Sequence, residues 1–129
     1  MKTKMKTTRG SGFTLLEIMI VVSIIGTLAA IAIPNFVRAR TASNQTTCIN
    51  NLRQISSAVG QWALETKSDP ATPVQYSDIQ NFLRRSVVCP SGGTAFGDSY
   101  TIVDVQTPPV CKNVPTGPNA HISPPDTTQ

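Results

Sequence analysis

The carboxylate of Glu17 is the side chain whose position in this sequence most clearly points to chemistry. It is the only ionisable group in the apolar run of residues 13–33, and it lies near the start of that run. On insertion scales a charge at the centre of a membrane helix costs about 2.5–3.5 kcal/mol. Ahead of it lie a small-residue junction, Gly10-Ser11-Gly12, and a basic leader containing Lys2, Lys4, Lys6 and Arg9. A sequence that keeps such a charge has a use for it, and we predict that the use is assembly.

Three cysteines offer a second kind of chemistry, disulfide formation. An odd number leaves one thiol unpaired. Cys89 and Cys111 flank the strongest strand signal in the chain, so we predict a disulfide between these two, with Cys48 left over. Closing that loop would stabilise the fold by about 3 kcal/mol in the chain-entropy model. A bond between Cys48 and Cys89 is the second choice.

The remaining reactive side chains form no catalytic or metal-binding motif. His121 is the only histidine, it lies in a Pro-rich tail, and the chain has no CxxC pair, so we expect a solvated histidine and no bound metal. Ser91 is interpreted as a turn serine. Asp104 and Asp126 are too few for a calcium site of six to eight oxygen ligands. The sequence therefore predicts no enzyme activity, no catalytic residue and no cofactor.

The element that must position Glu17 is a membrane-length helix over residues 13–33. At about 1.5 Å per residue this run spans roughly 30 Å, the thickness of the bilayer hydrocarbon. The basic leader favours a cytoplasmic N-terminus, which places the rest of the chain, including the cysteines, on the oxidising side. Without the four leader cations the chain has seven basic and seven acidic residues. Its basic pI therefore gives no support to nucleic-acid binding.

Pro34 begins a second helical segment, residues 34–67. Proline removes a backbone donor and disfavours helical geometry in the preceding residue, so we expect a kink there and not an end. An apolar stripe recurs at spacings of three and four residues and predicts a face packed in a core: Ile49, Leu52, Ile55, Val59 and Trp62.

The rest of the chain predicts a small β-containing region followed by a flexible tail. Ser77 is expected to cap a short helix over 77–85, and residues 100–105 read as a strand with 87–88 and 95–96 as candidate partners. The fold class is α+β, with a long N-terminal helix packed on a small antiparallel sheet. The expected parts are a leader (1–12), a membrane helix (13–33), its amphipathic continuation (34–67), the β-containing region (68–111) and a Pro-rich tail (112–129).

The stretch Gly12-Phe13-Thr14-Leu15-Leu16-Glu17, behind a basic leader and ahead of an apolar helix, closely resembles the class III signal of type IV pilins and type II secretion pseudopilins. Further along, Cys48–Ile55 and Cys89–Thr94 look like segments of short pseudopilin-like proteins. The resemblance implies a pilin-like fold and cleavage between Gly12 and Phe13 by a prepilin peptidase. It also implies N-methylation of Phe13 and retention of the helix.

The resemblance further implies that Glu17 pairs with the Phe13 amine of a neighbouring subunit during polymerisation. The implied partners are other copies of the chain, related minor pilins, the prepilin peptidase, a cytoplasmic ATPase and an inner-membrane assembly platform. The implied location is the bacterial inner membrane, single-pass with the C-terminal region in the periplasm, and then a periplasmic or extracellular filament.

Several alternatives stay open at this point. The apolar run could be an ordinary single-pass anchor, or a secretory signal cleaved after Ala30-Ile31-Ala32. Within the resemblance, a subunit of a type II secretion pseudopilus is favoured. A type IV pilus subunit for adhesion or motility and a competence pseudopilin for DNA uptake are the alternatives.

Overall fold

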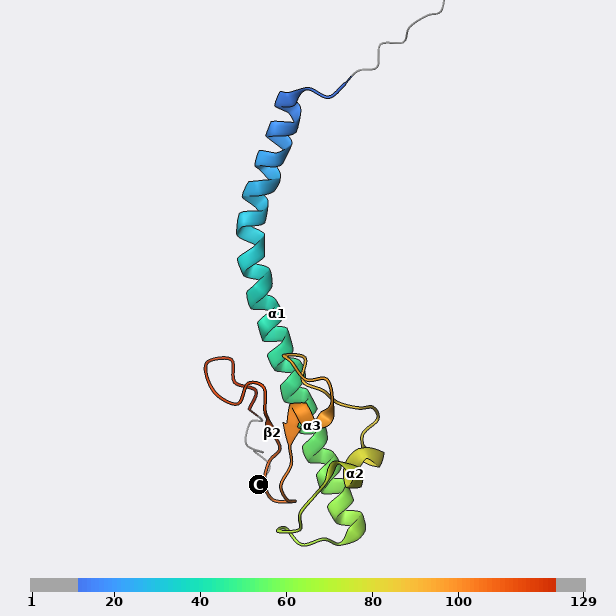
Figure 1. Cartoon of the computed structure of the whole chain (residues 1–129). Helices are drawn as coiled ribbons and strands as arrows, with labels where there is room; N and C mark the ends of the chain where they lie inside the picture. The colour runs from blue at the N-terminus through green and yellow to red at the C-terminus, as the bar shows by residue number, and fades with distance from the viewer. Residues whose placement is uncertain (1–11, 123–129) are drawn as a thin grey trace, which may run out of the picture. The chain divides into compact units, whose positions relative to one another are not determined.

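The computed structural model describes residues 12–122. Contacts divide the chain into two compact units after Val37. Helix α1, Leu15–Thr66, belongs to both, and the remaining short elements belong to the second unit (Figure 1). The fold class is α+β, as predicted: a long N-terminal helix and a two-stranded antiparallel sheet.

In the first unit α1 begins at Leu15, and its helical assignment continues without interruption through Pro34. Pro34 therefore does not end the helix, as the sequence predicted. The expected kink at Pro34 stays a prediction. The leader up to residue 11 lies outside the described residues.

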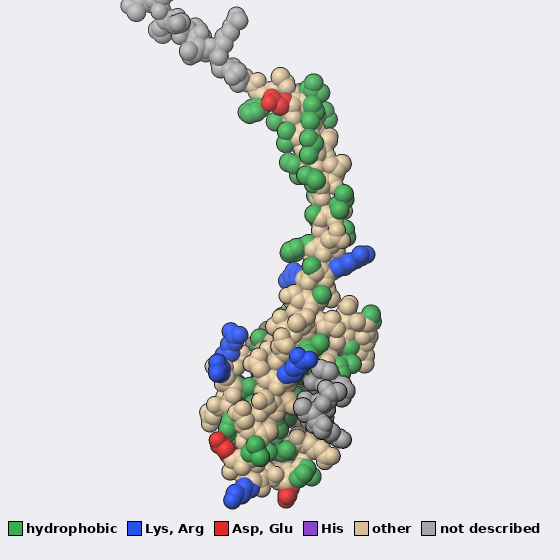
Figure 2. All heavy atoms as spheres, turned by 180° about the vertical axis from the view of Figure 1, so that it is seen from behind, with side chains coloured by type: hydrophobic (Ala, Val, Ile, Leu, Met, Phe, Trp, Pro, Cys, Tyr) green, Lys and Arg blue, Asp and Glu red, His purple; other side chains and the backbone are tan. Residues whose placement is uncertain are grey.

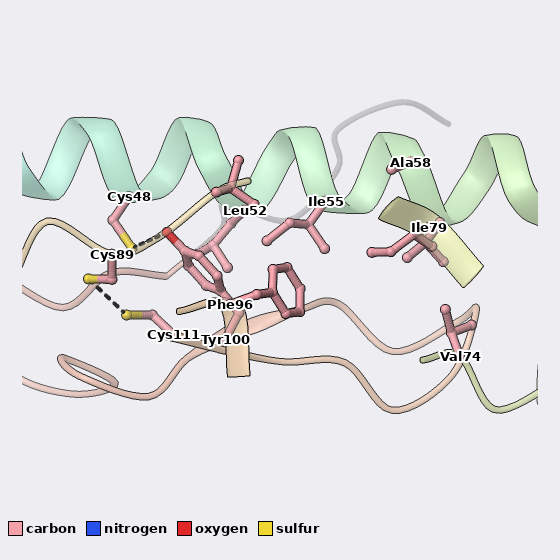
Figure 3. Packing of buried hydrophobic residues seen from close by; sticks show 12 residues of the cluster. Cys48, Leu52, Ile55, Ala58, Val74, Ile79, Cys89, Phe96, Tyr100 and Cys111 are labelled. Atoms are coloured by element: carbon pink, nitrogen blue, oxygen red, sulfur yellow. Dashed lines mark hydrogen bonds between the residues drawn. The ribbon is translucent and has the colours of Figure 1, made fainter. Parts of the chain in front are cut away.

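The core of the second unit is built on one face of α1. Leu52, Ile55 and Val59 are buried there, which confirms the central part of the predicted stripe. Ile49 and Trp62, at its two ends, are only half-buried, whereas Cys48 is fully buried. Facing the helix are buried side chains from the rest of the unit: Val74, Ile79, Val87, Cys89, Phe96, Tyr100 and Cys111 (Figure 3).

The C-terminus of α1 is closed by local backbone geometry. Lys67 adopts the left-handed conformation with φ of 54°, which is uncommon for a residue with a Cβ. The Ser68 N–H donates to the Ala63 carbonyl at 3.0 Å, the long hydrogen bond of a Schellman motif. The helix thus ends within one residue of the predicted boundary at 67.

The sheet is smaller than the sequence suggested. Strand β1, Tyr100–Thr101, pairs antiparallel with β2, Val110–Cys111, in the register Tyr100 with Cys111. The predicted strand over 100–105 is too long, because residues 103–105 instead bond to the segment 72–74. The Val74 N–H donates to the Val103 carbonyl at 3.1 Å and the Val105 N–H to the Thr72 carbonyl at 3.3 Å.

The predicted partners of the strand were also wrong. Phe96 begins a helical turn, α3, Phe96–Ser99, and residues 87–88 belong to no strand. The actual partner follows Pro108-Pro109, a pair that the sequence suggested only as a break. Proline cannot donate to a ladder, but it is tolerated beside the first residue of an edge strand.

The short helix near residue 80 starts and ends earlier than predicted. It consists of α2, Tyr76–Ile79, and the 3-10 helix η1, Gln80–Phe82. Gln75 and not Ser77 occupies the N-cap, and its backbone N–H donates to the Asp78 carboxylate at 2.9 Å. The acidic third residue of the helix therefore fixes its start.

The described part of the Pro-rich tail makes hydrogen bonds to the rest of the unit, and its flexibility stays a prediction. The Lys112 N–H donates to the Ser99 carbonyl at 2.9 Å, and the His121 N–H donates to the Val114 carbonyl at 2.8 Å. The Gln45 side chain of α1 donates to the Ala120 carbonyl at 3.0 Å. The tail therefore returns to α1 before residue 122. Residues 123–129 lie outside the described part of the chain.

Candidate functional site

The N-terminal part of α1 is apolar on every side. Its large hydrophobic side chains are all about half exposed or more, so nothing in the part of the chain that the structure describes covers this segment. Figure 2 shows hydrophobic side chains along one of its faces. A helix that is hydrophobic all round belongs in a membrane or in the core of a larger assembly. Among the described residues, α1 is also the one helix long and apolar enough to cross a membrane.

Two hydroxyl side chains inside this segment are satisfied by their own helix. The Ser23 Oγ donates to the Met19 carbonyl at 2.7 Å, and the Thr27 Oγ1 donates to the Ile24 carbonyl at 2.9 Å. Such bonds allow hydroxyl groups to enter an environment without water. Glu17 is the only residue of the apolar run 13–33 with an ionisable side chain. Its charge requires a partner at the helix N-terminus or from outside the helix.

Glu17 lies in the first turn of α1, where its carboxylate is near the positive end of the helix dipole. Its backbone N–H donates to the Thr14 Oγ1 at 3.2 Å, so Thr14 caps the helix. The spacing Thr14-x-x-Glu17 is a capping-box signature. This pattern could have predicted the start of the helix from the sequence. The cap fixes where the helix starts, directly after the predicted processing site.

The two residues of the predicted processing site lie before the helix. Gly12 and Phe13 are outside α1 and exposed, and the side chain of Phe13 is 81% exposed. An ideal Cβ on Gly12 would meet nothing within 4 Å. A peptide bond in this position is open to a peptidase. If it is cut, the new amine at Phe13 stands four residues from Glu17, just ahead of the first turn.

A second group of chemically active side chains lies in the core of the second unit. The Cys89 and Cys111 sulfurs are 3.6 Å apart, and the His121 Nδ1 lies 3.6 Å from the Cys89 sulfur and 3.7 Å from that of Cys111. Together with the Cys48 sulfur, these ligand atoms all lie within 4.8 Å of one another (Figure 3 shows the three cysteines). We call Cys48, Cys89, Cys111 and His121 the Cys3His cluster.

The Cys3His cluster collects residues from four separate segments. Cys48 comes from α1, Cys89 from the loop before α3, Cys111 from β2 and His121 from the tail. All three cysteines are fully buried and His121 is 2% exposed. The Cys48 sulfur also contacts the Tyr100 hydroxyl at 3.6 Å, and Asn51 donates to that hydroxyl at 3.0 Å.

The loop that carries Cys89 is held by Ser99 and by two glycines. The Cys89 N–H donates to the Ser99 Oγ at 3.0 Å, while the Gly93 N–H donates to the Cys89 carbonyl at 2.9 Å. A Cβ on Gly93 would overlap the Ser99 side chain and lie 3.1 Å from the Cys89 nitrogen. Gly92 has a φ of 140°, a conformation that favours glycine. The turn Cys89–Gly93 therefore requires both glycines.

The electrostatic environments within the cluster differ. Burial raises the pKa of the Cys48 thiol and of the Tyr100 hydroxyl well above their usual ranges. For Cys89, burial also acts to raise the pKa, but hydrogen bonds from the Ser91 backbone, the Asn113 side chain and the neighbouring cysteines outweigh it and lower the pKa. Burial lowers the pKa of His121, which keeps its imidazole neutral.

One expectation from the sequence is wrong: His121 is buried among sulfurs and is not a solvated tail residue. The predicted disulfide pair, Cys89 and Cys111, is brought together with its sulfurs 3.6 Å apart, against about 2.05 Å in a bonded pair. Cys48, expected to be left over, lies beside both. The disulfide itself stays a prediction.

The second unit also has a surface groove between α1 and the segment after η1. Its polar lining comes from Gln54, Ser57, Gln61 and Arg84. These residues include no carboxylate, histidine or cysteine that could serve as a general base or nucleophile. The groove therefore does not suggest catalysis.

Comparison with known proteins places these features in a family. A family model described as the prokaryotic N-terminal methylation motif matches residues 8–33. The type IV major pilin PilA of Myxococcus xanthus is 45% identical over 73 residues, which is 57% of this chain and 30% of that protein. The type IV narrow pilus major component PilA5 of Thermus thermophilus is 31% identical over 103 residues, 80% of this chain and 79% of the Thermus protein.

A third relative belongs to secretion systems. The type II secretion system core protein G of Aeromonas hydrophila is 32% identical over 68 residues, 53% of this chain and 48% of that protein. The chain thus spans about half of the length of this relative and less than a third of the Myxococcus pilin. No solved structure is significantly similar to it.

The matched motif covers the junction before Phe13, the Thr14 cap and Glu17, and the Thermus protein is matched over most of both chains. The relatives named here are pilins and a secretion-system core protein, and none is an enzyme by its name. The chain belongs to the type IV pilin and type II secretion pseudopilin family.

Proposed function

We propose that this chain is the structural subunit of a helical filament, processed between Gly12 and Phe13 and assembled through the apolar part of α1. The observation that carries the proposal is the exposure of large hydrophobic side chains on all faces of α1 in residues 15–33, with Glu17 as the only ionisable group. Such a surface is stable in lipid, and it is equally stable in a bundle of identical helices. The same helix can therefore serve first as an anchor and later as a filament core.

In this proposal cleavage by a prepilin peptidase supplies the charge that Glu17 lacks. The new amine of Phe13, which the peptidase family methylates, pairs with Glu17 of a neighbouring copy. A charge pair within an apolar bundle fixes the axial alignment of neighbouring helices, because any other alignment leaves a charge unpaired. An unpaired charge in such a bundle is strongly unfavourable. The subunit starts in the bacterial inner membrane, and an assembly platform driven by a cytoplasmic ATPase moves it into a periplasmic or extracellular filament beside related minor pilins.

The filament that we favour is a type IV pilus. The supporting fact is that the Thermus pilus component aligns over 79% of its own length, against 48% for the secretion protein. A type II secretion pseudopilus, which the sequence alone favoured, is the second candidate because several secretion core proteins are similar to about half of this chain. A chromosomal deletion separates the two: loss of surface filaments with normal exoprotein secretion identifies a pilus, and the reverse identifies a pseudopilus.

The assembly mechanism is tested by Glu17→Gln, a substitution that keeps the side-chain shape and removes the charge. The bond from the Glu17 backbone to Thr14 does not depend on the carboxylate, so the helix start is preserved. We expect normal membrane insertion and normal cleavage before Phe13, but loss of at least nine-tenths of the sheared filament, on the scale of the several kcal/mol at stake in a buried pair. Glu17→Ala should insert at least as well as the parent and also fail to assemble.

The matched control is Ser23→Ala, which also removes a polar group from the apolar run. The Ser23 hydroxyl bonds only its own helix, to the Met19 carbonyl, so the control should assemble at the parental yield. Edman sequencing or mass spectrometry of the filament then reports the first residue. Filaments at parental yield from Glu17→Gln would refute the register role, and a mature chain that begins near Pro34 would refute the retained helix.

A further inference from the structure

We propose that the Cys3His cluster is a structural zinc site, in which Cys48, Cys89 and Cys111 bind Zn²⁺ through their sulfurs and His121 binds it through Nδ1. The observation is the convergence of four buried ligand atoms, from four separate segments, within 4.8 Å of one another. Three thiols and one imidazole are a ligand set typical of structural zinc. The site uses none of the apolar residues 13–33, so it does not depend on their proposed use in assembly.

The distances among the Cys89 sulfur, the Cys111 sulfur and the His121 Nδ1 match those of a tetrahedral site. With Zn–S near 2.3 Å and Zn–N near 2.0 Å, tetrahedral geometry places two sulfurs about 3.8 Å apart and a sulfur about 3.5 Å from the nitrogen. The structure has 3.6 Å between the Cys89 and Cys111 sulfurs, and 3.6 and 3.7 Å from these to the His121 Nδ1. The Cys48 sulfur, from α1, is the fourth ligand atom and lies within 4.8 Å of the other three.

The loop around Cys89 is held by contacts that do not involve the metal. Gly93 leaves room for the Ser99 hydroxyl, which accepts a hydrogen bond from the Cys89 N–H at 3.0 Å. Neighbouring groups that hold a metal ligand in position in this way are usual at metal centres.

A zinc site also accounts for features that a disulfide leaves unexplained. A Cys89–Cys111 bond would leave Cys48 as a buried free thiol and would give the buried His121 no role. A Cys3His site uses all four. The second unit has two-residue strands and a small core, and a metal that binds only the folded state would add to its stability. Zinc would join the tail and β2 directly to α1.

The first experiment measures metal in the full-length chain, purified in detergent without chelator from cells supplied with zinc. We expect one zinc per chain by elemental mass spectrometry, and three alkylatable thiols after chelation under denaturing conditions without reductant. Replacement of zinc by Co²⁺ should give the d–d bands of a tetrahedral thiolate site. A chain without metal that carries a Cys89–Cys111 disulfide would overturn the proposal, and so would iron or copper in place of zinc.

The second experiment separates the two chemistries by substitution. His121→Ala and Cys48→Ser leave the Cys89–Cys111 pair intact, so a disulfide would survive both. At a zinc site, either substitution removes a ligand and should weaken zinc binding. The loss should exceed the roughly 10–100-fold that is typical when a residue that only hydrogen-bonds a ligand is removed. Val110→Ser, an exposed neighbour of Cys111 in β2, is the control and should keep the parental zinc content. Parental zinc content in both ligand variants would overturn the proposal even if wild type binds metal.

Discussion

Along the single helix α1, Leu28 and Ile31 in the first unit are 64% and 68% exposed, whereas Leu52 and Ile55 in the second unit are fully buried. The four side chains are similar in size and hydrophobicity. They differ because side chains from residues 74–111 pack over one face of the second part, whereas no described residue outside α1 covers the first part. Burial is therefore decided by the availability of a partner, and the proposed partners of the first part are lipid and neighbouring copies of the chain.

The comparison predicts opposite consequences for the same substitution in the two units. Leu52→Ala should lower the free energy of unfolding of the second unit by about 3 kcal/mol, because it removes buried methyl groups and leaves a cavity. Trp62 packs against this core and is the only tryptophan, so its fluorescence in a urea titration reports the loss. Leu28→Ala should leave this titration unchanged. An equal loss from both variants would show that the units do not fold independently.

A substitution that adds volume should sharpen the comparison inside the second unit. Gly93→Ala places a Cβ against Ser99 and the Cys89 nitrogen, so we expect a loss of about 2 kcal/mol from overpacking. Gly97→Ala, in α3, meets nothing within 4 Å and should be neutral or slightly stabilising. Thermal unfolding of the two variants side by side measures the difference. Similar melting temperatures would mean that the Cys89–Gly93 turn tolerates displacement.

The smallest expected effect lies at the end of α1. Lys67→Gly should stabilise the second unit by about 1 kcal/mol, because glycine adopts a φ of 54° without the Cβ penalty. Glu65→Gly, two residues earlier and inside the helix, should destabilise it by a similar amount. Urea titrations of both variants test the sign. Destabilisation by Lys67→Gly would show that the lysine side chain contributes more than its backbone strain costs.

The sequence predicted those features that depend on neighbours along the chain. The apolar run around Glu17, the continuation of the helix past Pro34 and the central stripe of Leu52, Ile55 and Val59 all follow from local pattern and helical period. The predictions were wrong where backbone segments far apart in the chain pair with each other. The strand at residue 100 pairs with β2 beyond a double proline, and residues 103–105 bond to 72–74. Neither partner carries a strong strand pattern of its own.

The Cys3His cluster shows the same limit more sharply. The sequence argued against a metal because it has no CxxC pair and because His121 lies in a Pro-rich tail. Spacing along the chain is informative only where ligands come in local pairs, and these four come from four segments. The tail offers a second case: the Gln45 side chain of α1 donates to the Ala120 carbonyl, a contact that spacing along the chain does not predict.

By itself, the sequence determined a membrane-length helix with one carboxylate near its start, a small-residue junction before it, and the α+β class. These follow from hydrophobic run length, helical period and local capping, which act between residues a few positions apart. Only the tertiary structure decided which residues face the core at either end of the stripe, which short strands pair, and that three cysteines and His121 meet. Those contacts bridge long stretches of chain, and they are fixed by the packing of the whole second unit against α1.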